Sequence, residues 1–198
     1  MLNKRLTPSK RAKAAIAAVV AASTSIGGLW YVVRPGEPPI PDDVVLASEY
    51  LVKPWEGEEL RAYLDVIAKP PVWTICNGDT ENVRKGMVET PEGCKKRLRK
   101  RLTKDFRPAL VKCIDGFGVK PLSWRAMMLS LSYNVGIGAG CKSTAAKLGR
   151  LDQYYSSCVA ATAFNKAGGK MIVGLANRRE MGDATRIGEG ELCVSGVQ

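Results

Sequence analysis

The sequence predicts an α+β domain that is mainly helical, with one small β lobe beside a cleft. Apolar residues recur at helical spacing both before residue 57 and after residue 90. Between them, Val72-Trp73-Thr74-Ile75 has strand-forming composition and is followed by Asn77-Gly78, a strong signal for a hairpin turn. The length of 198 residues suits one domain with an appendage.

The appendage is expected at the N-terminus. Residues 14–33 carry no charge, and five basic residues precede them: Lys4, Arg5, Lys10, Arg11 and Lys13. A helix of this length rises about 30 Å, enough to cross a hydrocarbon core, and the basic flank would keep its start in the cytoplasm. We therefore expect an N-terminal signal-anchor or signal segment over residues 1–35, a Pro-rich linker over 36–42 and the folded domain over 43–198.

Two other interpretations of the apolar segment stay open. Ala21-Ala22-Ser23 offers a cleavage site typical of a removed signal peptide. The segment can also be a helix in the core of a soluble protein. We favour an uncleaved anchor because the apolar stretch continues past these small residues to Val33 and is longer than most signal-peptide cores.

The first helix of the domain is expected near Val44, with Asp42 or Asp43 as its cap. Gly57 should end it, which leaves Glu56 at the helix end, facing a cleft. Its apolar face repeats at helical spacing through Val44, Ala47, Leu51, Val52 and Trp55.

The later elements are helices. Thr90 and Pro91 predict a helix start, with Thr as cap and Pro at the first position, and this helix should continue to about Cys113. A second runs from about Ser123 to Val135, and Gly136–Gly140 breaks it. Short helices are expected near Thr144–Leu148, Leu151–Thr162 and Leu175–Met181.

Composition excludes several classes of function. The chain has no histidine, so neither a Ser-His-Asp site nor a His-containing zinc site can form. The net charge is +11, but residues 37–198 hold 24 basic and 19 acidic residues, a net +5 that suits an anionic polymer. The basic run 95–102 has no nucleic-acid reader motif beside it, and we interpret it as the solvated face of a helix. No nucleic-acid partner is expected.

The six cysteines include no C-x-x-C pair, which argues against thiolate zinc or redox sites. An even count behind an export-like N-terminus predicts three disulfides in an oxidising compartment. The spacing allows 15 pairings and does not choose among them.

Two carboxylates carry the candidate chemistry. Glu56 and Asp65 have eight residues between them, and Thr74 opens the expected strand. A protonated acid and an ionised partner are what glycoside hydrolysis requires. Partial burial beside Trp55 would favour the proton-donating form of Glu56. The spacing alone is a weak signal.

The surrounding residues strengthen it. Glu56-Gly57, Ala62-Tyr63 with Asp65, and Val72-Trp73-Thr74-Ile75 together resemble the active-site segment of the phage-type lysozymes, glycoside hydrolase family 24. The resemblance continues through 126–140 and 164–179. One departure is the loop 66–73, which places eight residues between Asp65 and Thr74 where the family usually has five.

The resemblance implies a lysozyme-like fold and a role for each site residue. Glu56 would be the general acid, Asp65 the ionised partner that orients or activates water, and Thr74 the hydroxyl that holds this water. Arg178, or else Arg179, would pair with Glu56. Asn134 and the Gly168-Gly169 loop would lie along the sugar groove. On this fold the disulfides are expected to be Cys76–Cys94, Cys113–Cys141 and Cys158–Cys193.

The implied function is that of an endolysin. The chain would hydrolyse the β-1,4 bond between N-acetylmuramic acid and N-acetylglucosamine in peptidoglycan, without cofactor or metal, as a monomer that lyses the host. Residues 14–33 resemble the signal-anchor-release segments of some phage endolysins, which implies a protein first tethered to the inner membrane and then periplasmic in a Gram-negative host. A lytic transglycosylase, a chitinase and a non-catalytic wall-binding or membrane-disrupting protein are the alternatives.

Overall fold

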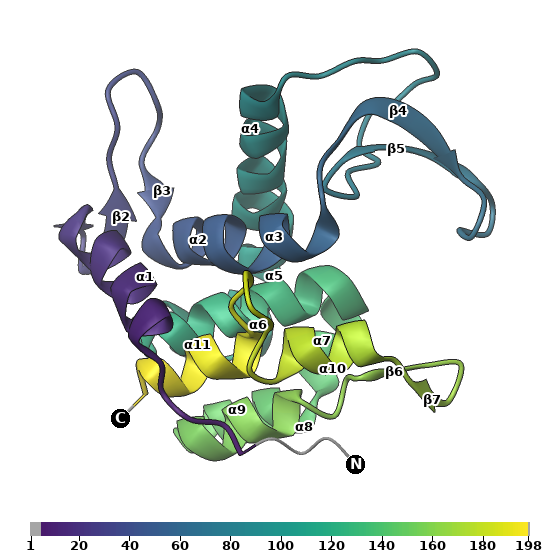
Figure 1. Cartoon of the computed structure of the whole chain (residues 1–198). Helices are drawn as coiled ribbons and strands as arrows, with labels where there is room; N and C mark the ends of the chain where they lie inside the picture. The colour runs from purple at the N-terminus through teal and green to yellow at the C-terminus, as the bar shows by residue number, and fades with distance from the viewer. Residues whose placement is uncertain (1–4, 198) are drawn as a thin grey trace.

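The computed structural model describes residues 5–197; residues 1–4 of the expected N-terminal segment, and Gln198, lie outside this range. A body of packed helices carries a long projecting hairpin, β4 (Glu59–Asp65) with β5 (Val72–Cys76), at one side (Figure 1). This is the α+β arrangement that the sequence predicts, with its small β lobe beside the helical lobe.

One continuous helical segment leads to the β lobe. It consists of α2 (Asp42–Ala47), the wider turn η1 (Ser48–Val52) and α3 (Lys53–Glu56). Gly57 ends it with φ +74°, a backbone conformation that L-residues with side chains rarely adopt. The expected end of the helix after Glu56 is therefore confirmed.

The expected capping role of Asp42 and Asp43 is wrong. Pro41 occupies the cap position, and both aspartates lie in the first turn with buried side chains. Arg125 donates to Asp42 Oδ1 at 2.8 Å and to Asp43 Oδ2 at 2.7 Å, and Arg107 Nε donates to Asp43 Oδ1 at 2.9 Å. Buried carboxylates need such partners, because an unpaired buried charge is very costly.

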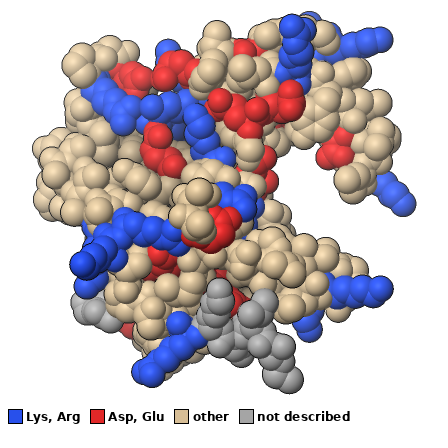
Figure 2. Space-filling view, in the orientation of Figure 1, with Lys and Arg blue, Asp and Glu red and all other residues tan. Residues whose placement is uncertain are grey.

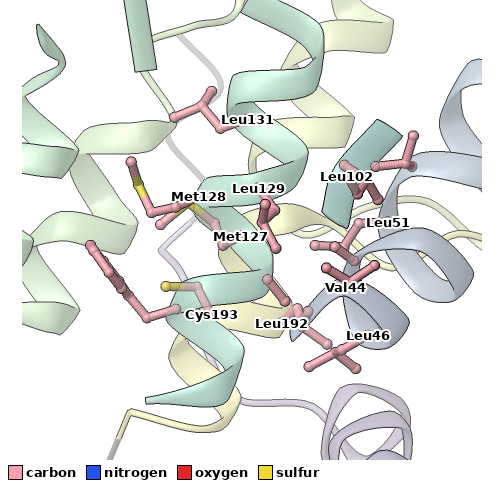
Figure 3. Close-up of a cluster of buried hydrophobic side chains, with 14 of the residues drawn as sticks. Val44, Leu46, Leu51, Leu102, Met127, Met128, Leu129, Leu131, Leu192 and Cys193 are labelled. Atoms are coloured by element: carbon pink, nitrogen blue, oxygen red, sulfur yellow. The ribbon is translucent and has the colours of Figure 1, made fainter. Parts of the chain in front are cut away.

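The core forms around α6 (Leu122–Val135), which α2 and α11 (Glu189–Ser195) cover. Figure 3 shows side chains from these helices and from η2 (Leu102–Phe106) pointing into one apolar cluster. Each large apolar side chain buried there stabilises the fold by about 1.5–3 kcal/mol. The labelled members are Val44, Leu46, Leu51, Leu102, Met127, Met128, Leu129, Leu131, Leu192 and Cys193.

The helix expected from Thr90 to Cys113 is confirmed as α4 (Pro91–Arg101), η2 and α5 (Arg107–Cys113). Thr90 Oγ1 accepts the N–H of Gly93 at 3.0 Å, as a cap does. The basic run on α4 is only partly a solvated face: Leu98 and Arg99 are buried, and Arg99 donates to Glu49 at 2.6 Å.

The remaining helices follow the expected order. After η3 (Phe117–Val119) and α6 come α7 (Ile137–Lys142), α8 (Thr144–Arg150), α9 (Tyr154–Ala161) and α10 (Val173–Arg179). Helices α7 and α11 and the two-residue strands β6 (Lys166–Ala167) and β7 (Lys170–Met171) were not predicted; α7 begins directly after the expected break at Gly136.

In the β lobe, β4 and β5 are antiparallel, with Tyr63 opposite Thr74 and Asp65 opposite Val72. The register shifts between Glu59 and Tyr63. Ile75 and Asp79 exchange both backbone hydrogen bonds at 2.9 Å, so the turn predicted at Asn77-Gly78 is confirmed.

The N-terminal segment differs from the expected single helix over residues 14–33. Helix α1 (Lys10–Ala21) ends within it, and a hairpin follows, β1 (Ser23–Ile26) with β2 (Leu29–Val32), which turns at Gly27-Gly28. Among residues 5–197, no helix combines the length and the apolar composition needed to cross a membrane. Ala12, Ala15 and Val19 are buried because α1 packs on α2 and α11 (Figure 1).

The expected linker is also partly built into the body. Strand β3 (Ile40–Pro41) pairs with β2, and Ile40, Pro41 and Asp42 are buried. A free extended linker would leave these residues in solvent. They belong to the packed structure because Ile40 joins the apolar core and Asp42 meets Arg125.

Arg11 fastens α1 to the C-terminal part of the chain. Its Nε and Nη2 donate to Glu191 Oε1 at 2.7 Å and Oε2 at 2.8 Å, and it also donates to the carbonyls of Asp183 and Met181. Burial alone would raise the pKa of Glu191, but the hydrogen bonds from Arg11, Ser9 and the Gly188 N–H outweigh it and lower the pKa.

Because of the Arg11–Glu191 ion pair, the stability of the folded protein should decrease at acid pH. A lowered folded-state pKa means that ionised Glu191 stabilises the protein above the unfolded-state value of about 4.3, and that this stability is lost as pH falls through the folded-state pKa. Glu191→Gln should therefore lower Tm at pH 7, and the difference from the unsubstituted protein should shrink below about pH 4. Thermal scans against pH check this, with the exposed Glu92→Gln as control; a gap independent of pH contradicts it.

All six cysteines are paired, and the pairing is the one expected on this fold. Cys76–Cys94 joins β5 to α4, Cys113–Cys141 joins α5 to α7, and Cys158–Cys193 joins α9 to α11. The β lobe and the C-terminal helix are thus both covalently tied to the helical body.

Candidate active site

Glu56 lies at the junction of the two lobes. Its side chain is 23% exposed and opens on a pocket of about 400 Å³. Figure 2 shows the molecule hollowed on this side, with acidic side chains gathered along the upper wall. The pocket is lined by Glu56, Gly57, Glu58, Glu59, Tyr63, Cys76 and Gly78.

Arg178 comes from α10 and is almost completely buried. Its Nη1 donates to Glu56 Oε1 at 2.6 Å, so the contact expected between these two residues is present. A charge-assisted hydrogen bond of this kind holds the Glu56 carboxyl in one orientation. The alternative partner, Arg179, is fully buried and instead donates to Glu189 Oε2 at 2.6 Å.

Asn134 stands beside the same carboxyl, in the last turn of α6. Its Nδ2 lies 3.5 Å from Glu56 Oε1, and its Oδ1 accepts a hydrogen bond from Arg179 Nη2. The residue predicted to bind sugar is therefore also a contact of the candidate acid.

Glu189 is a further residue of this site, which the sequence did not indicate. It is fully buried, and it accepts hydrogen bonds from Ser130, Arg178 and Arg179. Two consecutive arginines on a predicted helix signal that buried carboxylates must be close. The sequence does not say which carboxylates, because Glu189 lies ten residues beyond Arg179, on a helix that it did not predict.

Asp65 lies at the far end of β4. Its Oδ1 accepts the backbone N–H of Ile67 at 2.9 Å and that of Ala68 at 3.4 Å, and these bonds fix the start of the longer loop. Tyr63, also on β4, feels the charges of both Asp65 and Glu56. The pKa of its phenol is raised mainly by burial, and then by the negative charges of Asp65, Glu59 and Glu56. The phenol therefore lies within the electrostatic reach of both candidate carboxylates.

Thr74 is on β5, opposite Tyr63, and is 3% exposed. Its hydroxyl lies 3.3 Å from the carbonyl oxygen of Val72, to which it donates. Thr74 is not among the residues that line the pocket at Glu56. The structure thus brings Glu56, Arg178 and Asn134 together, and leaves Asp65 and Thr74 on the opposing hairpin.

Gly168 and Gly169 form the turn between β6 and β7, with φ +56° and +78°. The expected tight loop is confirmed. Both positions are exposed, and a side-chain carbon added at either would meet nothing within 4 Å.

A second group of contacts holds the β lobe against α6. Tyr133 Oη donates to the carbonyl of Asn77 at 2.7 Å, and Asn77 in turn donates to the carbonyl of Gly57. Burial, with the charges of Glu56 and Asp79 adding to it, raises the pKa of Tyr133 well above its usual range. The phenol therefore stays a hydrogen-bond donor at any physiological pH, and the turn stays next to Glu56.

Chemically, the site offers one orientated carboxyl at a pocket, with a buried arginine behind it. Such a carboxyl can donate a proton to a leaving oxygen.

Comparison with known proteins agrees with this chemistry. The family model described as phage lysozyme matches residues 53–182. The SAR-endolysin of Enterobacteria phage P21 is 31% identical over 147 residues, which are 72% of this chain and 79% of that protein. The endolysin from Escherichia coli O157:H7 phage FAHEc1 superposes with a TM-score of 0.59 at 26% identity, over 80% of this chain and 94% of that one.

The active form of the P1 phage endolysin Lyz has the same fold, with a TM-score of 0.60 over 94% of this chain and 95% of that one, at 18% identity. The family match covers well over half of the chain and includes Glu56, Asp65, Thr74 and Arg178. The chain therefore belongs to the phage lysozyme family and is a phage endolysin that hydrolyses peptidoglycan.

Proposed function

We propose that this endolysin is a family 24 lysozyme (EC 3.2.1.17), which hydrolyses the β-1,4 bond between N-acetylmuramic acid and N-acetylglucosamine. The observation that carries the proposal is the Glu56 carboxyl, which opens on the pocket and is held by Arg178 at 2.6 Å. In this mechanism Glu56 protonates the glycosidic oxygen as the bond breaks.

Asp65 is the proposed anionic partner, which orients or activates water or stabilises positive charge on the sugar ring. Two backbone N–H groups donate to its Oδ1, and the charges of Asp65 and Glu56 both act on the phenol of Tyr63. Thr74 is proposed to hold the attacking water, supported by its position on the strand opposite Tyr63. Direct attack by this water would invert the anomeric configuration.

Asn134, Gly168 and Gly169 are the proposed sugar contacts. Asn134 is exposed beside Glu56, and the two glycines leave the backbone of the β6–β7 turn open to a ligand. No cofactor or metal takes part in this proposal, and the enzyme acts as a monomer.

For localisation, we propose an enzyme that residues 14–33 tether to the inner membrane and that later acts in the periplasm of a Gram-negative host. The uncharged stretch, its basic flank and the similarity to proteins named SAR-endolysin support this. Packing of α1 on α2 and α11 would then belong to the released enzyme.

Digestion of purified peptidoglycan tests the chemistry. Mass analysis should find reducing N-acetylmuramic acid ends, and Asp65→Asn should lower their yield about 100-fold or more, because the water-activating carboxylate is lost. The exposed Asp115→Asn serves as control. Anhydromuramic ends, with Asp65→Asn still active, would instead identify a lytic transglycosylase.

The same assay separates the remaining alternatives. A chitinase would degrade chitin oligomers at a rate comparable with peptidoglycan, whereas a non-catalytic lysis protein would release no sugar fragments from either polymer. Proton NMR of the first product formed distinguishes inversion from retention at the anomeric carbon.

A further inference from the structure

We infer that Glu189 is a positioning residue for Glu56, which balances the charge of the buried arginines so that Glu56 can carry the proton that it donates. The inference rests on the proposed role of Glu56. Glu189 touches no substrate; it acts through Arg178 and Arg179.

Two chains of contacts connect Glu189 to Glu56. Glu189 Oε1 accepts from Arg178 Nε at 3.2 Å, and Arg178 Nη1 donates to Glu56 Oε1 at 2.6 Å. By the second route, Glu189 Oε2 accepts from Arg179 Nη1 at 2.6 Å, and Arg179 donates to Asn134, which contacts Glu56. A change at Glu189 therefore reaches Glu56 from two sides.

The charges explain why this matters. Arg178 and Arg179 are 3% and 0% exposed; Arg178 contacts the Glu56 carboxyl directly, and Arg179 reaches it through Asn134. A buried positive charge favours the ionised form of a neighbouring carboxyl unless another negative charge balances it, whereas a general acid must hold its proton until the leaving oxygen takes it. Glu189, also 0% exposed, supplies a negative charge that remains when Glu56 is protonated.

Arg178 has two carboxylate partners, Glu56 at 2.6 Å and Glu189 at 3.2 Å. Burial alone would lower the pKa of Arg178; the charge of Glu189, and after it that of Glu56, outweighs burial and raises the pKa. Ser130 Oγ donates to Glu189 Oε1 at 2.6 Å and fixes the carboxylate toward Arg178. Arg178 can thus orient Glu56 by a hydrogen bond while Glu189 also balances its charge.

The test compares pH profiles of kcat for full-length Glu189→Gln and Glu189→Asp on peptidoglycan. In Glu189→Gln, loss of the negative charge should move the alkaline limb of the kcat profile to lower pH by about one unit, because Glu56 then loses its proton more readily. Activity on that limb falls about tenfold as a result. Glu189→Asp restores the charge, so its limb should return toward the unsubstituted position even where kcat stays low.

Asp43→Asn is the matched control, since Asp43 is an equally buried carboxylate in the separate Arg125 cluster. It should lower Tm without moving the limb. A folded Glu189→Gln protein with lower kcat but an unmoved limb would overturn the inference and leave Glu189 a purely structural residue.

If Glu189→Gln does not fold, the pH profile of kcat for Ser130→Ala tests the inference instead. This substitution removes the donor that fixes the Glu189 carboxylate toward Arg178, which should weaken this pairing and move the alkaline limb to lower pH. An unmoved limb in that variant also overturns the inference. Full activity of Glu56→Gln would instead refute the proposed function, whatever the Glu189 variants do.

Discussion

Glu56→Gln should lower the rate of peptidoglycan hydrolysis about 10²–10⁴-fold, the range expected for loss of a general acid. Glutamine keeps the size of the side chain and can still accept a hydrogen bond from Arg178 Nη1, but it has no proton to donate to the glycosidic oxygen. The measurement is the release of reducing ends from purified peptidoglycan at equal concentrations of folded enzyme.

Stability should be almost unaffected by this substitution. Glu56 is partly exposed, and Arg178 keeps its second carboxylate partner, Glu189. Glu92→Gln, an exposed residue in the first turn of α4, is the control for removing one acidic charge. If Glu56→Gln lyses cells as well as the control at the same expression level, catalysis by Glu56 is not the lytic mechanism.

Arg125→Met should destabilise the folded protein by about 3–5 kcal/mol, the usual cost of breaking a buried ion pair. Arg125 is 3% exposed and donates to Asp42, to Asp43 and to the carbonyl of Lys120. Its loss leaves Asp42 without a charged partner, and Asp43 with only Arg107. Thermal unfolding should show Tm lower by about 10 °C.

The exposed Lys112→Met controls for loss of a positive charge. Combining Arg125→Met with Asp42→Asn and Asp43→Asn removes the unpaired charges as well, and should recover part of the lost stability. If Arg125→Met unfolds at the same temperature as the unsubstituted protein, these carboxylates do not need Arg125.

The prediction of the main elements succeeded where the signal is local. The helix cap at Thr90, the end of the helix at Gly57 and the turn at Asn77-Gly78 each depend on the backbone preferences of neighbouring residues, and the structure has all three. Helix α6 was predicted from about Ser123 to Val135 because a long apolar stretch ends at Gly136. The short α11 was missed because Gly188, Gly190 and Gly196 weaken its local signal.

Local patterns also did not indicate that the N-terminal segment and the linker pack on the body, for a related reason. An uncharged, Ala-rich stretch suits both a lipid-spanning helix and a helix packed closely on others, because small side chains allow both. Ala12 and Ala15 lie against the body in this structure, and Arg11 meets Glu191, 180 residues away along the chain. Local sequence patterns contain no information about such distant partners.

By itself, the sequence determined the fold class, the position of Glu56 at a helix end and, through the family that it resembles, the pairing of the six cysteines. Only the tertiary structure decided which charges meet: Arg178 with Glu56 and Glu189, Arg179 with Asn134, and Arg125 with two buried aspartates. The physical reason is the distance along the chain over which each kind of interaction acts. Backbone preferences act over a few residues, whereas a buried charge is stabilised by whichever opposite charge the folded chain brings within hydrogen-bonding distance.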